Sequence, residues 1–184
     1  MAWTSGHDVR MFFMNEPDEL YLPDPAKMRD VGDSEDIQLP ERIGRLVQER
    51  PYGVLCTQSQ SQPYGSLVAL AATEDLTSFF FSTPIATRKY RLLSECNQVA
   101  LVIDSRSGAP IELMQVEAVT ATGRAHVVSP GPDFERWAGL LIERHPYLAA
   151  FVRAESSALF RIEVDRYFHV CHFQEVRQWS PSRL

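Results

Sequence analysis

The sequence predicts an α+β domain that is mostly β, with antiparallel strands and flanking helices. Short apolar runs alternate with turn residues between Gly53 and Phe81, a pattern typical of a meander of strands. A polar junction then leads into a helix that begins with two adjacent cations. The almost continuous apolar run Gln98–Asp104 follows, and it indicates a strand buried on both faces.

The elements before the junction follow from apolar spacing and chain breakers. Apolar residues at helical spacing predict a helix over 37–50, which Pro51 ends. Residues 53–58 and 64–72 are the first two predicted strands, separated by a polar turn. The Phe-rich run 77–81 is the third.

The second half of the chain predicts further strands and one long helix. Residues 113–128 alternate Val, Ala and Thr, which indicates one bent strand with Gly123 at the bend. Residues 132–144 place their large apolar side chains on one helical face. Residues 158–164 and 167–173 predict a hairpin that closes the sheet.

The N-terminal 36 residues differ in composition from the rest of the chain. They are rich in proline and acidic residues, yet they hold too many aromatic residues for a fully disordered tail. We expect residues 1–36 to form an irregular arm that packs on the barrel or on a partner subunit. Residues 37–184 are long enough to form one domain with a full core.

Composition excludes several classes of protein. The 184 residues carry a net charge of −6, which argues against a nucleic-acid partner because that would require a basic face. No apolar run approaches the roughly 20 residues of a membrane span, and no targeting signal stands at the N-terminus. The three cysteines show no metal-ligand spacing and favour reduced thiols. We therefore expect a cytoplasmic protein with no membrane partner.

The junction between the Phe-rich strand and the next helix allows two helix starts. The helix could begin at Pro84 with Thr83 as its N-cap, or at Arg88 with Thr87 as its N-cap. Both starts place the two cations near the same point.

This junction predicts a phosphate receptor. The first turn of a helix has unpaired N–H groups and the positive end of the helix dipole, and nearby hydroxyl groups and cations strengthen such a site. The alternative is a surface helix whose cations face water. The candidate residues are Ser82, Thr83, Thr87, Arg88 and Lys89.

The order of elements and two motifs resemble the FMN-binding split-barrel family, which includes the pyridoxamine 5'-phosphate oxidases. Gln62-Pro63-Tyr64 stands where the family has a Gln-Pro-Tyr turn before its flavin-lining strand. The Thr-Arg-Lys-Tyr-Arg-Leu-Leu segment follows the third strand as in the family. The resemblance runs from about Leu39 to about Trp179. It implies a six-stranded antiparallel split β-barrel of Greek-key topology, with residues 37–184 as the FMN-binding domain.

The resemblance also implies a set of cofactor-binding residues but no catalytic residue. The isoalloxazine ring would lie against one strand, the FMN phosphate against the junction, and a glutamine from a later strand near the ring. These positions are Ser66, Leu67, Val68 and Ala69 for the strand, Ser82, Thr83, Thr87, Arg88 and Lys89 for the phosphate, and Gln115 for the glutamine.

The departures from the family concern the substrate. The true oxidases carry Arg and Lys on the flavin strand where this chain has Ser66 and Ala71. The later helical segment and the C-terminal strand also lack the family's substrate-binding pattern. Because an uncompensated dianion is costly to bury, we expect FMN as cofactor without pyridoxamine 5'-phosphate as substrate.

A possible metal cluster near the C-terminus does not fit a regular strand. His169 and Cys171 would face one side and His172 the other, so the three side chains are not expected to converge. The sequence therefore predicts no metal site.

These observations together predict an FMN-dependent oxidoreductase. It would act as a homodimer with flavin at the interface and react with a small-molecule electron donor or acceptor. Three alternatives stay open, namely a flavin-binding or sensory module without turnover, a haem-handling relative, and a deazaflavin-binding variant.

Overall fold

The computed structural model describes residues 38–59, 61–106, 115–172 and 175–182. The predicted arm (1–36) lies outside the described residues, as do residues 113 and 114 of the long predicted strand. In chain order the elements are α1 (Gln38–Glu49), β1 (Tyr52–Ser59), β2 (Gln62–Ala69), β3 (Ala71–Ala72), β4 (Ser78–Pro84), α2 (Arg88–Glu95), β5 (Gln98–Asp104), β6 (Ala118–Val127), α3 (Pro132–Arg144), η3 (Pro146–Leu148), α4 (Ala149–Val152), β7 (Ser157–Cys171) and β8 (Glu175–Trp179).

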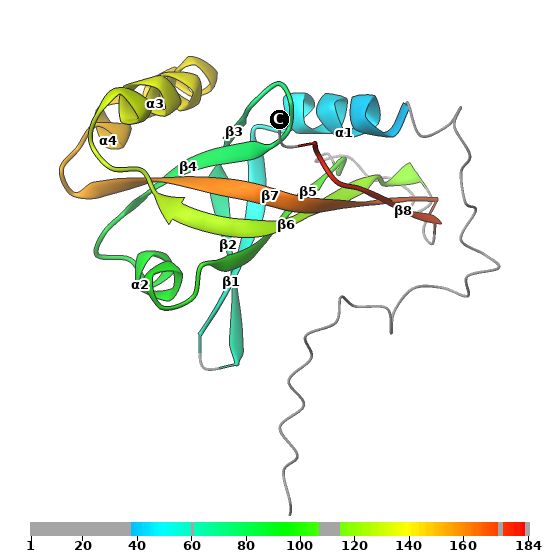
Figure 1. Ribbon diagram of the computed structural model, residues 1–184, viewed down its shortest axis with the longest axis horizontal. Helices are drawn as coiled ribbons and strands as arrows, with labels where there is room; N and C mark the ends of the chain where they lie inside the picture. Colours follow the sequence, from blue (N-terminus) through cyan, green and yellow to red (C-terminus); the bar gives the residue numbers. More distant parts are fainter. Residues whose placement is uncertain (1–37, 60, 107–114, 173–174, 183–184) are drawn as a thin grey trace, which may run out of the picture. The chain divides into compact units, whose positions relative to one another are not determined.

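The strands form one antiparallel sheet in the order β2-β1-β5-β6-β7-β4-β3, and β8 pairs with β7. The first and last strands of this path, β2 and β3, are separated in the chain by Leu70 alone. The sheet must therefore curl back on itself, and Figure 1 shows it as a half-barrel with helices on its flanks. The predicted split barrel is confirmed, with β1, β2 and β4–β7 as its six longest strands.

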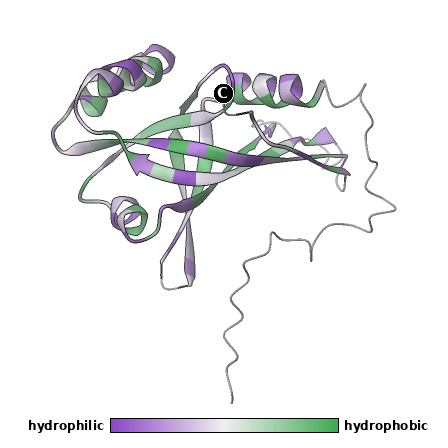
Figure 2. Ribbon diagram, in the orientation of Figure 1, coloured by the Kyte–Doolittle hydropathy of each residue, from purple (hydrophilic) through white to green (hydrophobic). Residues whose placement is uncertain are grey.

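The main core fills the inside of the barrel, and α1 covers one end of it. Ile43, Leu46 and Val47 of α1 are buried in the same cluster as Phe79 and Phe81 of β4. The hydrophobic residues of α1 lie on the side of the helix that faces the sheet (Figure 2). The predicted helix over 37–50 is thus confirmed as an amphipathic cap on the barrel.

A second, smaller core lies between α3, α4 and the outside of β3, β4 and β7. Ala138 and Leu141 of α3 pack there with Ala71 and Leu159. Phe80 points to this side and stacks on Trp137, with ring centroids 4.5 Å apart. β4 is therefore buried on both faces, which explains its unbroken aromatic run.

Gly123 marks a bend in β6, as the sequence predicts. The register of β6 against β7 shifts between Thr122 and Gly123. A Cβ atom at Gly123 would lie 2.0 Å from the carbonyl oxygen of Glu163. Only glycine fits this close approach of two strands without a shift of the backbone.

The predicted hairpin over 158–164 and 167–173 is wrong. Residues 157–171 form one continuous strand, β7, and β8 makes the hairpin instead. Burial along β7 changes phase at Asp165, because Ile162 and Val164 are buried before it and Tyr167 after it. The register places Val164 opposite Gly123 and Arg166 opposite Thr122, which leaves Asp165 as the extra residue of a β-bulge.

The described residues include no helix long and apolar enough to cross a membrane.

Candidate cofactor-binding site

Of the two predicted starts for the helix after β4, the structure shows the one at Arg88, with Thr87 as N-cap. Thr87 is the N-cap, with extended backbone, and its Oγ1 accepts a hydrogen bond from the Tyr90 N–H at 3.3 Å. Thr87 Oγ1 also donates to the Pro84 carbonyl at 2.8 Å. The helix therefore begins at Arg88, and the N–H groups of Arg88 and Lys89 have no acceptor within it.

The three hydroxyl groups of the junction bond within the protein. A hydroxyl carries one proton, and Thr87 uses its own on Pro84, so Thr83 is the donor in the 3.1 Å contact between Thr83 and Thr87. Ser82 donates to the Ala158 carbonyl at 3.2 Å. These hydroxyls would have to rotate to donate to a phosphate, which leaves the cations and the free N–H groups as the available donors.

Lys89 connects the junction to β2. Its side chain is half-buried, and Nζ donates to the Leu67 carbonyl at 3.4 Å and lies 6.0 Å from the centre of the Phe81 ring. Burial lowers the pKa of Lys89. Within the part of the chain that the structure describes, no carboxylate pairs with Lys89, and two of its three N–H donors have no partner.

Arg88 makes a second link to β2. Its guanidinium carbon lies 4.8 Å from the centre of the Tyr64 ring, a cation–π contact. Arg88 forms no ion pair with the described residues, so this exposed cation also keeps its charge available to an anion.

The residues of β2 differ in what they offer a ligand. The Leu70 N–H bonds to the Pro51 carbonyl, on the β1 side, while the Leu67 carbonyl accepts from Lys89. Backbone groups alternate sides along an antiparallel strand, so Leu67 and Ala69 direct their N–H and C=O away from β1. Ser66 and Val68 direct theirs toward β1.

The side chains of β2 divide in a similar way. Leu67 is 68% exposed, whereas Val68 is buried in the barrel core. Ser66 is half-buried, and its Oγ lies 3.5 Å from the Leu55 carbonyl, which makes at most a weak hydrogen bond. The contact that the resemblance implies for Val68 therefore cannot involve its side chain.

Gln115 is not brought to the other predicted residues within one chain. It is exposed and precedes β6, whose first residue pairs with Asp104 of β5. β6 is separated from β2 by β5 and β1. Three strand spacings amount to about 14 Å, so Gln115, predicted to lie near the ring, is well separated from β2 within one chain.

The donor set fits a phosphate-bearing cofactor. Two cations without carboxylate partners, two free N–H groups at a helix start and rotatable hydroxyls converge on one junction. Leu67 and Ala69 add backbone donors along the neighbouring strand. The sequence predicted these groups from their order in the chain, but it could not show that the hydroxyl protons are used internally.

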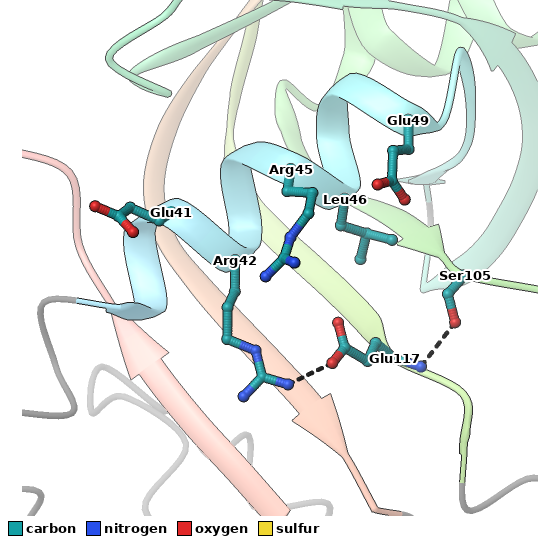
Figure 3. A pocket seen from close by; sticks show the side chains of 7 residues that line it. All are labelled: Glu41, Arg42, Arg45, Leu46, Glu49, Ser105 and Glu117. Atoms are coloured by element: carbon teal, nitrogen blue, oxygen red, sulfur yellow. Dashed lines mark hydrogen bonds and ion pairs between the residues drawn. The ribbon is translucent and has the colours of Figure 1, made fainter.

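A charged cavity of about 450 Å³ lies elsewhere, between α1 and the ends of β5 and β6 (Figure 3). Arg42 and Arg45 project from α1 toward Glu117, and Arg42 forms an ion pair with it. Three carboxylates and two cations line this cavity, so its charge does not favour an anion. None of the ten predicted cofactor residues lines this cavity or two further cavities on the described part of the chain.

Behind Glu117 lies His169, a buried residue that the sequence did not connect with this cavity. Neither ring nitrogen of His169 has a hydrogen-bond partner among the described residues, and Nε2 is 3.7 Å from Glu117 Oε2. Burial lowers the pKa of His169, against the opposing effect of Glu117. Burial raises the pKa of Glu117, but the hydrogen bond and charge of Arg42 outweigh it and lower that pKa overall. The native state therefore favours a neutral His169 beside an ionised Glu117.

The fold is that of a split barrel, and two cations stand at the start of the helix that follows β4. Residues 39–171 match the sequence profile of the pyridoxamine 5'-phosphate oxidase family. This match covers most of the chain, and the chain belongs to that family. No curated protein matches the chain by sequence.

Solved structures with the same fold have low sequence identity to this chain. A haem-binding protein from Mycobacterium smegmatis superposes with a TM-score of 0.69 at 14% identity, covering 77% of this chain and 57% of that one. The chain thus spans little more than half of that protein. General stress protein 26 from Bacillus anthracis gives a TM-score of 0.59 at 12% identity, covering 78% and 98%. HutZ, a haem storage protein from Vibrio cholerae, gives 0.56 at 17% identity, covering 76% and 92%.

Proposed function

We propose that this protein is an FMN-dependent oxidoreductase that acts as a homodimer with FMN at the subunit interface. The observation that carries the proposal is Lys89, a half-buried cation with no carboxylate partner among the described residues, at the N-terminus of α2. Partial burial of an ammonium group without a counter-ion carries a desolvation cost, and a phosphate would supply the opposite charge. Membership of the pyridoxamine 5'-phosphate oxidase family supports flavin as the carrier of the phosphate.

Each part of the site has a distinct role in this proposal. Arg88 and Lys89, with their backbone N–H groups, would hold the phosphate, and Ser82, Thr83 and Thr87 would turn their hydroxyls toward it. The outward N–H groups of Leu67 and Ala69 would donate to the ring edge and stabilise negative charge there. When bound, FMN would supply hydride and one-electron transfer. A small molecule would act as electron donor or acceptor.

The surface of the barrel supports a dimer. Val54 on β1 lies directly opposite Leu67 on β2, and these side chains are 37% and 68% exposed. Tyr52, 45% exposed, lies on the same outer face. A second copy packed on this apolar face would shield it from water. It could also bring its own Gln115 near the ring.

Pyridoxamine 5'-phosphate is not the proposed substrate. Ala71 is buried under α3 in the second core and offers no charge. Ser66 stands where the true oxidases have a cation. With both cations missing, a second phosphate would lack its counter-charges.

The absorption spectrum of the purified protein, with the released cofactor identified by mass, tests the proposal. FMN is expected. If the released cofactor is a deazaflavin, or haem as bound by the Mycobacterium smegmatis protein, that molecule is the cofactor and FMN is not. Apoprotein that fails to quench FMN fluorescence at high-micromolar FMN would refute it. Flavin that binds but is never reduced by nicotinamide or thiol donors would indicate a non-catalytic module.

A further inference from the structure

The turn between β7 and β8 brings together three side chains that can bind a metal. Cys171 is the last residue of β7, His172 follows it, and Glu175 is the first residue of β8. One ligand atom from each lies within 4.8 Å of the others. Glu175 Oε2 is 3.1 Å from His172 Nδ1 and 3.8 Å from Cys171 Sγ.

The backbone explains why strand alternation does not apply here. His172 has φ 46°, in the left-handed region, so the regular strand ends at Cys171. Its side chain therefore returns to the side of Cys171 instead of the opposite face. His169 is not part of this group. The expected set of His169, Cys171 and His172 therefore does not converge, but the prediction that His172 faces away from Cys171 is wrong, and Glu175 is the third residue of the observed group.

Two of the three distances between ligand atoms are close to those of a tetrahedral zinc site, and the third pair, from Cys171 and His172, lies within 4.8 Å. Zinc binds cysteine sulfur at about 2.3 Å and histidine nitrogen or carboxylate oxygen at about 2.0–2.2 Å. In a tetrahedron these bonds place nitrogen and oxygen about 3.4 Å apart, and sulfur and oxygen about 3.6 Å apart. The observed 3.1 Å and 3.8 Å lie within a few tenths of these values, so small side-chain rotations suffice.

Arg177 holds Glu175 in a suitable orientation. Its Nη2 and Nε donate to Glu175 Oε1 at 2.6 Å and 3.1 Å, which directs Oε2 toward Cys171 and His172. Hydrogen bonds from Arg177, then from His172, lower the pKa of Glu175 to about 2, so it is a carboxylate at neutral pH. Supporting hydrogen bonds of this kind are usual around metal ligands.

We propose that Cys171, His172 and Glu175 form a binding site for zinc or a chemically similar divalent transition metal. Cys171 would release its thiol proton and bind as thiolate, His172 would bind through Nδ1 and Glu175 through Oε2. Water would occupy the fourth position. This site is separate from the proposed flavin site and does not depend on it.

Titration of the full-length protein with Co²⁺ tests the site. Binding at one ion per chain should produce a thiolate-to-cobalt charge-transfer band in the difference spectrum, and Zn²⁺ should abolish the band by displacement. Cys171→Ser should remove the band. Glu175→Gln and His172→Asn should each weaken Co²⁺ binding at least tenfold. Asparagine is chosen because it tolerates the left-handed backbone.

Two control variants separate this site from adventitious binding. His126→Asn removes an exposed histidine on β6, and Cys96→Ser removes a cysteine outside the turn. Both should keep wild-type affinity. If Cys171→Ser does not fold, as judged by circular dichroism, His172→Asn decides the question, because His172 is exposed. Absence of the charge-transfer band, or unchanged affinity in His172→Asn, would show that the three residues only close the turn through the His172–Glu175 ion pair.

Discussion

The two cations at the start of α2, Arg88 and Lys89, have different surroundings. Lys89 is half-buried against Phe81 and bonds to a strand carbonyl, whereas Arg88 is exposed and stacks on Tyr64. A single anion placed at the helix N-terminus would lie near both. The half-buried Lys89 should contribute more to binding than the exposed Arg88, because solvent screens its charge less.

Removing either cation should weaken FMN binding selectively. Lys89→Ala or Arg88→Ala should cost about 1–3 kcal/mol of FMN affinity, the usual value of a hydrogen bond to a charged group. Riboflavin lacks the phosphate and should bind the wild type and both variants equally. Fluorescence titration of each apoprotein measures this. Wild-type FMN affinity in both variants would mean that Arg88 and Lys89 are only surface charges.

Ser66 on β2 and Ala71 on β3 predict poor turnover of pyridoxamine 5'-phosphate. Without the cations that Ser66 and Ala71 replace, substrate binding should be weaker by several kcal/mol, roughly two charged hydrogen bonds. Oxygen consumption by FMN-loaded protein checks this expectation. Turnover at the level of a true oxidase would overturn the residue-level argument and leave the family membership unchanged.

The buried His169 predicts a pH dependence of stability. Its pKa is lowered in the native state, so below about pH 6.5 the unfolded chain binds a proton that the native protein does not. The free energy of unfolding should therefore fall as pH decreases from 7.5 to 5.5, by at most about 1.4 kcal/mol per pH unit for this group. Glu117, whose pKa is also lowered, adds its own loss only near and below its ordinary pKa.

Urea unfolding of His169→Leu and His126→Gln at pH 7.5, 6.5 and 5.5 checks this prediction. The His169 variant should lose less stability than the wild type across this range. The exposed His126 serves as the control and should leave the slope unchanged. Equal slopes in all three proteins would contradict a neutral His169 in the native state.

At the scale of elements, the sequence predicts most helices and strands correctly because apolar spacing and chain breakers are local signals. α1 and α3 lie where the helical periodicity places them, and β5 lies where the apolar run places it. The prediction that β5 is buried on both faces is wrong, because only alternate residues of β5 are buried. The errors arise where a local signal has two meanings. The change of phase at Asp165 predicts a turn, but pairing with β6 keeps the chain extended and makes it a bulge. Likewise, the run 64–72 divides at Leu70 because β2 and β3 pair with different strands.

The candidate site, like the helices and strands, could be predicted from the sequence where its residues are close together in the chain. The motif after β4 identified its cations and hydroxyls, because they are close in sequence. The buried side chain of Val68 and the internal bonds of Thr83 and Thr87 depend on packing between distant segments. The turn at His172 was missed because a left-handed residue other than glycine leaves no clear trace in a single sequence.

Two glycines allow a matched test of the bend in β6. Gly123→Ala would place a Cβ atom against the Glu163 carbonyl and should lower the free energy of unfolding by about 1–3 kcal/mol. Gly139→Ala in α3 meets no atom within 4 Å and should raise it by about 0.5–1 kcal/mol, as expected inside a helix. Urea unfolding measures both. An unchanged free energy of unfolding in Gly123→Ala would show that β6 and β7 can move apart at the bulge without loss of stability.

At the scale of the whole molecule, barrel closure decides which residues can meet in one chain. It brings β2 beside α2 through Lys89 and Leu67, but it leaves Gln115 three strands away. It also leaves Val54 and Leu67 side by side on the outside. In the proposed dimer, a second copy of the chain would cover this apolar face and could place its own Gln115 near the flavin ring.

A variant that loses the dimer should also lose affinity for FMN. Sedimentation should give the wild type twice its chain mass of 20.9 kDa. Val54→Asp places a charge on the apolar outer face, where burial in an interface is costly, and should yield a monomer with weakened FMN affinity. Val127→Asp is the control, because Val127 is 50% exposed on β6, next to the cavity lined by α3 residues. Val127→Asp lowers strand propensity as Val54→Asp does, and this variant should stay dimeric. A wild-type monomer with bound flavin would disprove the interface.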